Sequence, residues 1–154
     1  MRQDNMKFGD PPIVVAQSFM VSVERVWDAI TVPDQMTQWY FENMPDFKPE
    51  VGFQTSFLTE VEDRRYTHQW EVTDVVPGRQ VTYRWTYKEH PGVGHVVFTI
   101  AKTGTQSTLT LTNTIDRDFP EDVPEFQREA CMGGWDYFIR NRLKQFLDPA
   151  APLL

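Results

Sequence analysis

The sequence is poor in cysteine and in basic residues, and each shortage excludes a class of protein. Its single cysteine, Cys131, cannot form an internal disulfide, which excludes a disulfide-stapled secreted domain and suits a reducing compartment. Its 15 Lys and Arg residues against 22 Asp and Glu residues give a net charge of -7. Phosphate backbones and anionic lipid surfaces repel such a chain, so we expect no nucleic-acid partner and no membrane partner.

Long apolar runs are also missing. No stretch approaches the roughly 20 apolar residues that a membrane-spanning helix needs. Residues 1–6 lack the apolar run of a signal peptide, so we expect a cytoplasmic protein. What the sequence has in abundance is aromatic residues, with 11 Phe, 5 Trp and 5 Tyr in 154 residues. A chain of this length fits one domain, whose rings must either fill a dense core or line a cavity.

The sequence offers little to a catalyst or a metal. The three histidines, His68, His90 and His95, do not have the spacing of metal ligands. No serine lies in a nucleophile elbow, and no glycine loop of the kind that cradles phosphate is present. We therefore predict no catalytic residue, no metal and no cofactor, which disfavours an enzyme without excluding one.

The first third of the chain predicts one strand and two short helices. Residues 1–10 are polar and are expected to be flexible, and residues 13–19 are β-branched and apolar, as in a strand. Ser22 is a candidate N-cap for a helix whose apolar residues share one face. Residues 31–34 have the pattern of a capping box, with proline in the first turn of a second helix that ends near Tyr40.

The remainder predicts five more strands and a long helix. Period-two patterns at 53–61, 66–76, 80–88, 95–102 and 108–115 are separated by short turns, with a loop expected at 90–94, and so predict an antiparallel meander. Their alternation gives the sheet one apolar, aromatic face. A capping box at Asp122 and Glu125 then opens an amphipathic helix that continues to Leu147. The sequence thus predicts a single α+β domain over 1–154, with a curved antiparallel sheet wrapped around a long C-terminal helix and two short helices after the first strand. This is the helix-grip, or Bet v 1-like, fold.

Short motifs along the chain resemble those of the activator of Hsp90 ATPase homologue 1-like family, within the SRPBCC (START/Bet v 1-like) superfamily. They are VWDAIT at 26–31, QWY at 38–40, EVGF at 50–53, VTDVVP at 72–77 followed by VTYRW at 81–85, TLTLTN at 108–113 and GGW at 133–135. Two positions depart from the family pattern, since Phe53 stands where a second glycine is common and Asn113 where histidine is frequent. The resemblance covers residues 22–147 and implies the helix-grip fold without implying one function.

The candidate ligand-binding residues are the inward-facing rings and one amide. They are Trp39, Phe57, Trp70, Tyr83, Trp85, Tyr87, Phe98, Asn113 and Trp135. These rings line a hydrophobic cavity in one hypothesis and fill the core in the other. The pair Gly133 and Gly134 likewise either leaves room for a ligand or lets the helix approach the sheet.

Three functions follow as hypotheses. The first is the binding of an apolar or amphipathic small molecule between the sheet and the C-terminal helix, with Tyr83, Tyr87 or Asn113 making polar contacts. The second is a co-chaperone-like activator of an Hsp90-type ATPase, and the third is an aromatase/cyclase-type enzyme of the same superfamily. A chaperone partner and a homodimer are left open.

Overall fold

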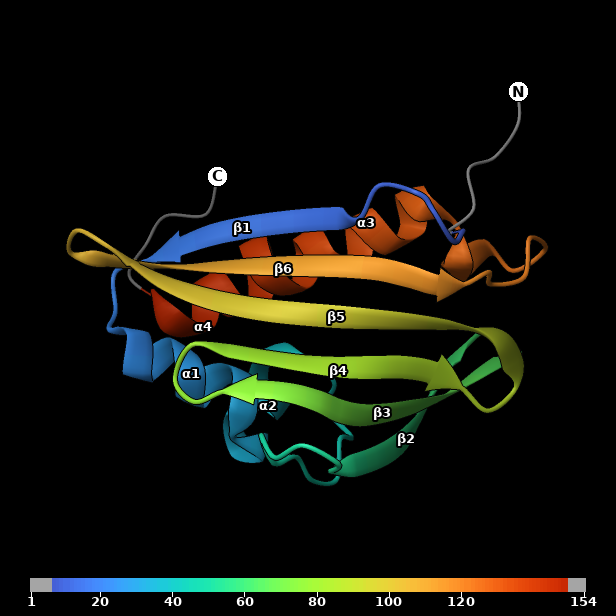
Figure 1. Ribbon diagram of the computed structural model, residues 1–154, viewed down its shortest axis with the longest axis horizontal. Helices are drawn as coiled ribbons and strands as arrows, with labels where there is room; N and C mark the ends of the chain where they lie inside the picture. Colours follow the sequence, from blue (N-terminus) through green and yellow to red (C-terminus); the bar gives the residue numbers. More distant parts are fainter. Residues whose placement is uncertain (1–6, 150–154) are drawn as a thin grey trace.

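A computed structural model describes residues 7–149, in which a six-stranded antiparallel sheet curves around a C-terminal helix (Figure 1). The strands are β1 (Ile13–Phe19), β2 (Gln54–Val61), β3 (Arg64–Val76), β4 (Gln80–Tyr87), β5 (His90–Thr103) and β6 (Gln106–Arg117). Their order in the sheet is β1-β6-β5-β4-β3-β2, so the first strand pairs with the last and the others form a meander. The predicted fold class is confirmed.

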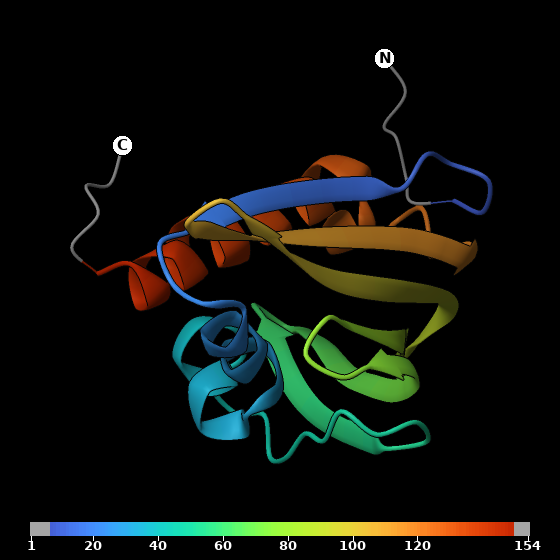
Figure 2. The same cartoon turned by 60° about the vertical axis from the view of Figure 1, so that its left-hand side comes forward.

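The helices lie on one face of this sheet. They are α1 (Val23–Thr31), α2 (Pro33–Trp39), the 3-10 turn η1 (Pro124–Phe126), α3 (Arg128–Asp136), the π-helix η2 (Tyr137–Leu143) and α4 (Lys144–Leu147). The C-terminal helix, from α3 through α4, runs along β1 and β6, while α1 and α2 lie beside its C-terminal end (Figure 2). Within residues 7–149, no helix has the length and apolar character needed to cross a membrane.

The ends of the two short helices are only partly as predicted. Ser22 caps α1, since its hydroxyl accepts the N–H of Arg25 at 3.1 Å. The capping box expected at 31–34 was wrong: Thr31 is the last residue of α1, and its buried hydroxyl donates to the carbonyl of Trp27 at 2.6 Å. Val32 therefore stands at the N-cap of α2 without a side-chain cap, and Pro33 occupies the first turn as expected.

The start of the long helix also differs from the prediction. Asp122 and Glu125 do not form a capping box, because residues 124–126 form a separate 3-10 turn and α3 begins only at Arg128. The carboxylate of Glu125 is instead bound by Arg64 of β3. The local pattern assigned the Glu125 side chain to the N-terminus of the helix, but it forms a bidentate ion pair with Arg64 instead.

The middle of the long helix is a π-helix rather than the continuous α-helix that the periodicity predicted. The residues that the long helix as a whole presents to the sheet, Trp135, Ile139, Leu143 and Leu147, are all buried and lie four apart. An α turn holds fewer than four residues and a π turn more than four, so their drifts have opposite senses and residues four apart stay near one face of the helix.

The loop expected at 90–94 was wrong as well, because these residues belong to β5. His90 pairs with Tyr87, and Gly94 pairs with both Trp85 and Ile115. Gly92 makes this possible, since its φ of +118° is a conformation that side chains strongly disfavour.

Residues 7–10, part of the segment expected to be flexible, form a turn in which the N–H of Phe8 donates to Asp118 at 2.8 Å. Residues 1–6 of that segment lie outside the described residues.

Candidate functional site

A cavity of about 370 Å³ lies between the inner face of the sheet and the N-terminal half of the long helix. Its sheet wall comes from five strands, β2 to β6. His68 of β3, Trp85 and Tyr87 of β4, and Asn113 and Ile115 of β6 all line it. Strand alternation brings these side chains to one face, and the β3–β4 register places His68 directly opposite Tyr87.

The opposite wall comes from the helix and is built partly of small side chains. Ala130, Cys131 and Gly134 line the cavity beside the larger Trp135 and Phe138. A Cβ added at Gly134 would meet no atom within 4 Å. The glycine therefore leaves room and is not required for close packing against the sheet.

The cavity opens to solvent between the end of β2 and this helix. Val61, at the end of β2, is 40% exposed, and Ala130 and Gly134 are also exposed lining residues. Phe119 and Phe126 close the adjoining side from the segment that joins β6 to α3. The site is thus a ring-lined chamber with one exposed rim.

Four of the nine predicted ligand-binding residues line this cavity, namely Trp85, Tyr87, Asn113 and Trp135. The other five, Trp39, Phe57, Trp70, Tyr83 and Phe98, are at most 6% exposed and belong to a dense cluster of rings beside it. Two of these have their polar atoms already paired: the indole N–H of Trp39 donates to the Ala29 carbonyl at 2.8 Å, and the Tyr83 hydroxyl bonds that of Tyr40 at 2.8 Å. The aromatic residues therefore both fill a core and line a cavity.

His68 is the lining residue of greatest chemical interest that the predicted set omitted. Its position two residues before Trp70 on a period-two strand was the signal that it faces inward. Its imidazole is 4% exposed and packs against Phe41 and Phe57, with ring centroids 4.8 Å from each. Nδ1 lies 3.1 Å from the carbonyl oxygen of Tyr66, and since a carbonyl only accepts, Nδ1 carries the proton.

Burial lowers the pKa of His68 to about 4, because the charged imidazolium would lose its hydration. At neutral pH the ring is therefore uncharged, and Nε2 holds a free electron pair. Within residues 7–149, the hydrogen bond of this ring shorter than 3.5 Å is made by Nδ1 and not by Nε2, and a backbone hydrogen bond with Phe57 has only a small effect on the pKa. The cavity wall thus contains a neutral hydrogen-bond acceptor.

Asn113 joins the two walls. Its amide N–H donates to the His95 carbonyl at 3.3 Å, and its amide oxygen accepts the indole N–H of Trp135 at 3.2 Å. The amide faces inward, as predicted, and its N–H also satisfies a nearby backbone carbonyl. Its main effect is to fix the Trp135 ring against the sheet.

Cys131 is an unreactive thiol in this setting. Its Sγ donates to the Glu125 carbonyl at 3.5 Å, and burial raises the pKa of the thiol to about 11 against a smaller lowering by Arg128. A thiol of such a pKa holds almost no thiolate at neutral pH. Cys131 therefore contributes shape and a polarizable surface to the wall.

A cluster of three side chains ties the β2–β3 hairpin to the segment before the helix. Nε and Nη2 of Arg64 reach the two oxygens of Glu125 at 2.6 and 3.0 Å, and the Tyr66 hydroxyl donates to the same carboxylate. The hydrogen bonds from Arg64 hold the pKa of Glu125 below its usual range, and burial raises the pKa of Tyr66 to about 12. Glu125 is thus an ionised carboxylate at the edge of the cavity, already fully engaged by its own neighbours.

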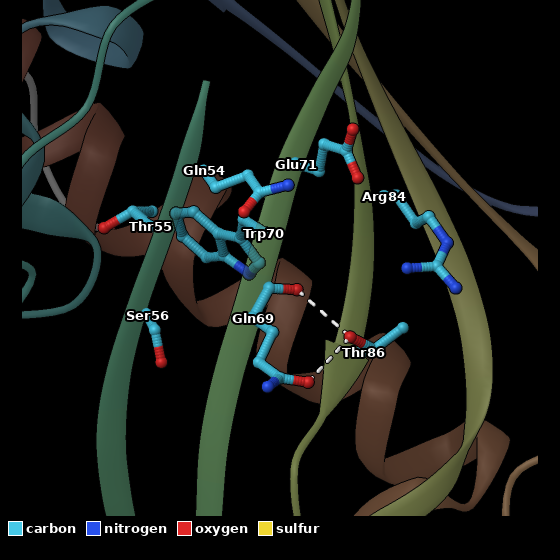
Figure 3. Close-up of a pocket in the computed structure, with 8 residues that line it drawn as sticks. All are labelled: Gln54, Thr55, Ser56, Gln69, Trp70, Glu71, Arg84 and Thr86. Carbon is cyan, nitrogen blue, oxygen red and sulfur yellow. Dashed lines mark hydrogen bonds between the residues drawn. The ribbon is translucent and has the colours of Figure 1, made fainter. Parts of the chain in front are cut away.

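A second hollow lies on the outer face of the sheet, across β2, β3 and β4 (Figure 3). Its side chains are mostly polar, among them Gln54, Ser56 and Arg84, and Thr86 donates to the side-chain oxygen of Gln69 at 3.1 Å. It is more open than the inner cavity, and apart from Trp70 its lining residues are polar. The inner cavity is therefore the better candidate for a ligand site.

The described residues contain no cluster of three or more His, Cys, Asp or Glu side chains that could hold a metal ion.

Comparison with known families matches residues 20–148 to the model of activator of Hsp90 ATPase homolog 1-like proteins. The chain belongs to this family. A search of curated proteins found no match.

Solved structures of similar fold include a Mesorhizobium loti protein that is 25% identical, with a TM-score of 0.71, covering 92% of this chain and 99% of that one. The Aha1 dimer from Colwellia psychrerythraea is 16% identical, with a TM-score of 0.69, covering 92% of this chain and 98% of that one. A putative protein of the dynemicin biosynthetic locus is 24% identical, with a TM-score of 0.70, covering 93% of this chain and 49% of that one. The last two likenesses concern the fold alone. Family and fold are compatible with ligand binding and with a co-chaperone role.

Proposed function

We propose that the protein binds an apolar or amphipathic small molecule in the cavity between the sheet and the C-terminal helix. The observation that carries the proposal is the cavity itself, about 370 Å³ in volume, ring-lined and open at one rim. Small-molecule sites typically occupy roughly 300–1,000 Å³ and combine apolar walls with a few polar groups. The volume lies near the lower limit of that range, which favours a ligand of about two fused rings.

Gly134 gives the sharpest test, because Gly133 offers a matched control. Neither glycine has an atom within 4 Å of the position its Cβ would occupy, but only Gly134 lines the cavity. Gly134→Leu should place an isobutyl group in the cavity, whereas Gly133→Leu should place it elsewhere on the same helix. Each variant should gain up to about 1 kcal/mol of stability from removing a helical glycine.

Binding of the two-ring aromatic compounds 2-naphthol and 2-methoxynaphthalene would be measured by thermal shift and by native mass spectrometry of the purified protein. A ligand that binds only the folded state at 100 times its Kd stabilises it by about 2.7 kcal/mol. We expect the wild type and Gly133→Leu to show this shift and Gly134→Leu to lose it. Equal shifts in both variants would place the ligand elsewhere, and no shift in the wild type would contradict the proposal.

A second candidate is stimulation of an Hsp90-type ATPase, supported by the description of the family to which the chain belongs. It needs a protein-binding surface and does not need an open cavity. The same pair of variants separates the two functions, because Gly134→Leu should leave ATPase stimulation intact. Stimulation in the wild type with no ligand binding would favour the co-chaperone role.

A further inference from the structure

The polar atoms around the cavity identify the class of ligand, on the premise that the proposed binding function holds. Most polar side chains of the wall are already paired within the protein. Asn113 bonds both His95 and Trp135, Glu125 is held by Arg64, and Cys131 donates to a carbonyl. These groups therefore have few free hydrogen-bonding atoms for a ligand.

Three further polar groups line the wall. Nε2 of His68 takes no part in the hydrogen bond between Nδ1 and Tyr66, and the Trp85 indole N–H interacts with the Tyr87 hydroxyl oxygen, so that the Tyr87 hydroxyl keeps its own proton to donate. They belong to neighbouring positions, because the His68 ring centroid lies 4.9 Å from that of Tyr87 and 5.3 Å from that of Trp85. The three side chains are therefore neighbours on the same wall and together offer an acceptor and a donor.

A hydroxyl group matches this arrangement. It has one proton to donate to Nε2 of His68, and its oxygen can accept from Tyr87. A ketone or an ether can only accept, so its entry would leave Nε2 desolvated and unpaired. Such a loss costs far more than a missing apolar contact, which gives the site a means of discrimination.

The remaining walls favour an aromatic framework for that hydroxyl. Trp85 of the sheet and Trp135 of the helix both line the cavity and touch edge to face, with centroids 5.6 Å apart, and Phe126 packs on Tyr87 at 5.0 Å. Planar ligands stack and make edge contacts with such rings.

The electrostatics favour a neutral ligand. His68 is uncharged at neutral pH and Glu125 is an ionised carboxylate, so the lining residues, all within 7–149, offer no free cation to an acidic ligand. Burial of an unpaired charge in an apolar cavity is strongly unfavourable.

We propose that the cavity binds a neutral aromatic alcohol or phenol, whose hydroxyl donates to Nε2 of His68 and accepts from Tyr87.

The test compares 2-naphthol with 2-methoxynaphthalene, which keeps the two rings and the oxygen but has no proton to donate. Their dissociation constants would be measured by fluorescence titration at pH 7 with the wild type, His68→Phe and His68→Gln. We expect the wild type to bind 2-naphthol at least about tenfold more tightly, a difference of about 1.4 kcal/mol. In His68→Phe this preference should fall below about twofold while 2-methoxynaphthalene still binds, which also shows that the variant is folded. His68→Gln, whose side-chain oxygen can accept, should restore part of the preference.

Equal binding of the two probes by the wild type would overturn the hydroxyl inference and leave the binding function standing. A preference that persists unchanged in His68→Phe would also overturn it, because the hydroxyl would then be recognised elsewhere. Failure of the wild type to bind either probe would overturn both the inference and the proposed function.

Discussion

Acidification from pH 7 to pH 5 should destabilise the protein by about 2 kcal/mol through His68 alone. The pKa of this imidazole is about 4 in the folded protein, against 6.5 for the ordinary side chain. Between pH 4 and pH 6.5, the imidazole of His68 is protonated in the unfolded chain and unprotonated in the folded protein. Stability therefore falls as the pH drops below 6.5, and the whole loss, about 3 kcal/mol, is reached below pH 4.

The window from pH 7 to pH 5 separates His68 from the carboxylates. Glu125 has a lowered pKa in the folded protein, so its contribution is present above the ordinary glutamate value of 4.5 and is lost only below it. Replacement of His68 should therefore remove most of the fall in unfolding free energy between pH 7 and pH 5. His68→Phe is the suitable variant, since a phenyl ring can stack on Phe57 as the imidazole does, at a centroid distance of 4.8 Å.

Urea denaturation at half-unit pH steps measures the effect, provided that the m-value stays constant. We expect the wild type to lose about 2 kcal/mol between pH 7 and pH 5 and His68→Phe to lose less than about 0.5 kcal/mol. His95→Gln serves as the control, because His95 lies at the surface beside Asp116 and its removal leaves the His68 contribution in place. Parallel curves for the wild type and His68→Phe would refute the reasoning, as would an NMR titration of the folded protein that placed the pKa of His68 near 6.5.

Two further predictions concern the Arg64–Glu125 pair at the edge of the cavity and Gly92, which lies against the lining residue Phe119. Arg64→Met should raise the pKa of Glu125 toward its usual range, measured by NMR of the side-chain carboxyl carbon, whereas Arg65→Met should leave it unchanged; equal effects would contradict the bidentate pair. Gly92→Ala should cost about 2–3 kcal/mol in urea denaturation, because its φ is +118° and the new Cβ would lie 2.4 Å from the Phe119 ring. Gly104→Ala, with a φ of +65° and nothing within 4 Å, should cost only about 1 kcal/mol, so comparable losses would argue against the clash.

The sheet was predictable because its signal is local. Period-two alternation in β4 places Val81 and Tyr83 on the core side, both fully buried, and Arg84 outside. Such a pattern depends only on which face of the strand is apolar. The same logic reaches Asn113, whose inward position follows from its register with Leu111.

The helix ends and the rim were less predictable, because competing partners decide them. Nothing near Glu125 in the sequence indicates that Arg64, 61 residues earlier, would bind its carboxylate. Thr31 has the local pattern of a capping residue, but its hydroxyl is taken by the preceding turn of α1. In both places the local pattern predicted a cap, but the side chain forms a different contact in the folded chain.

The division of one aromatic face into a solid core and a cavity depends on what lies opposite each ring. Trp70 and His68 are neighbours on the inner face of β3, yet Trp70 is covered by Tyr40, at a ring distance of 5.4 Å, while His68 lines the cavity. The difference comes from the helical layer, where the segment after α2 supplies large rings at one end of the sheet and α3 supplies Ala130, Cys131 and Gly134 at the other.

This contrast points to a sequence signal for the cavity. Residues 130, 131 and 134 are small and share one side of a helix whose later inward positions, Ile139 and Leu143, are large and fully buried. Opposite them, β4 carries its aromatic residues in alternation up to Tyr87. A small helical face set against a strand of rings leaves volume unfilled, whereas large residues on both sides fill it. Periodicity alone marks both ends of the sheet as apolar, and residue size on the facing helix then distinguishes the end that is hollow.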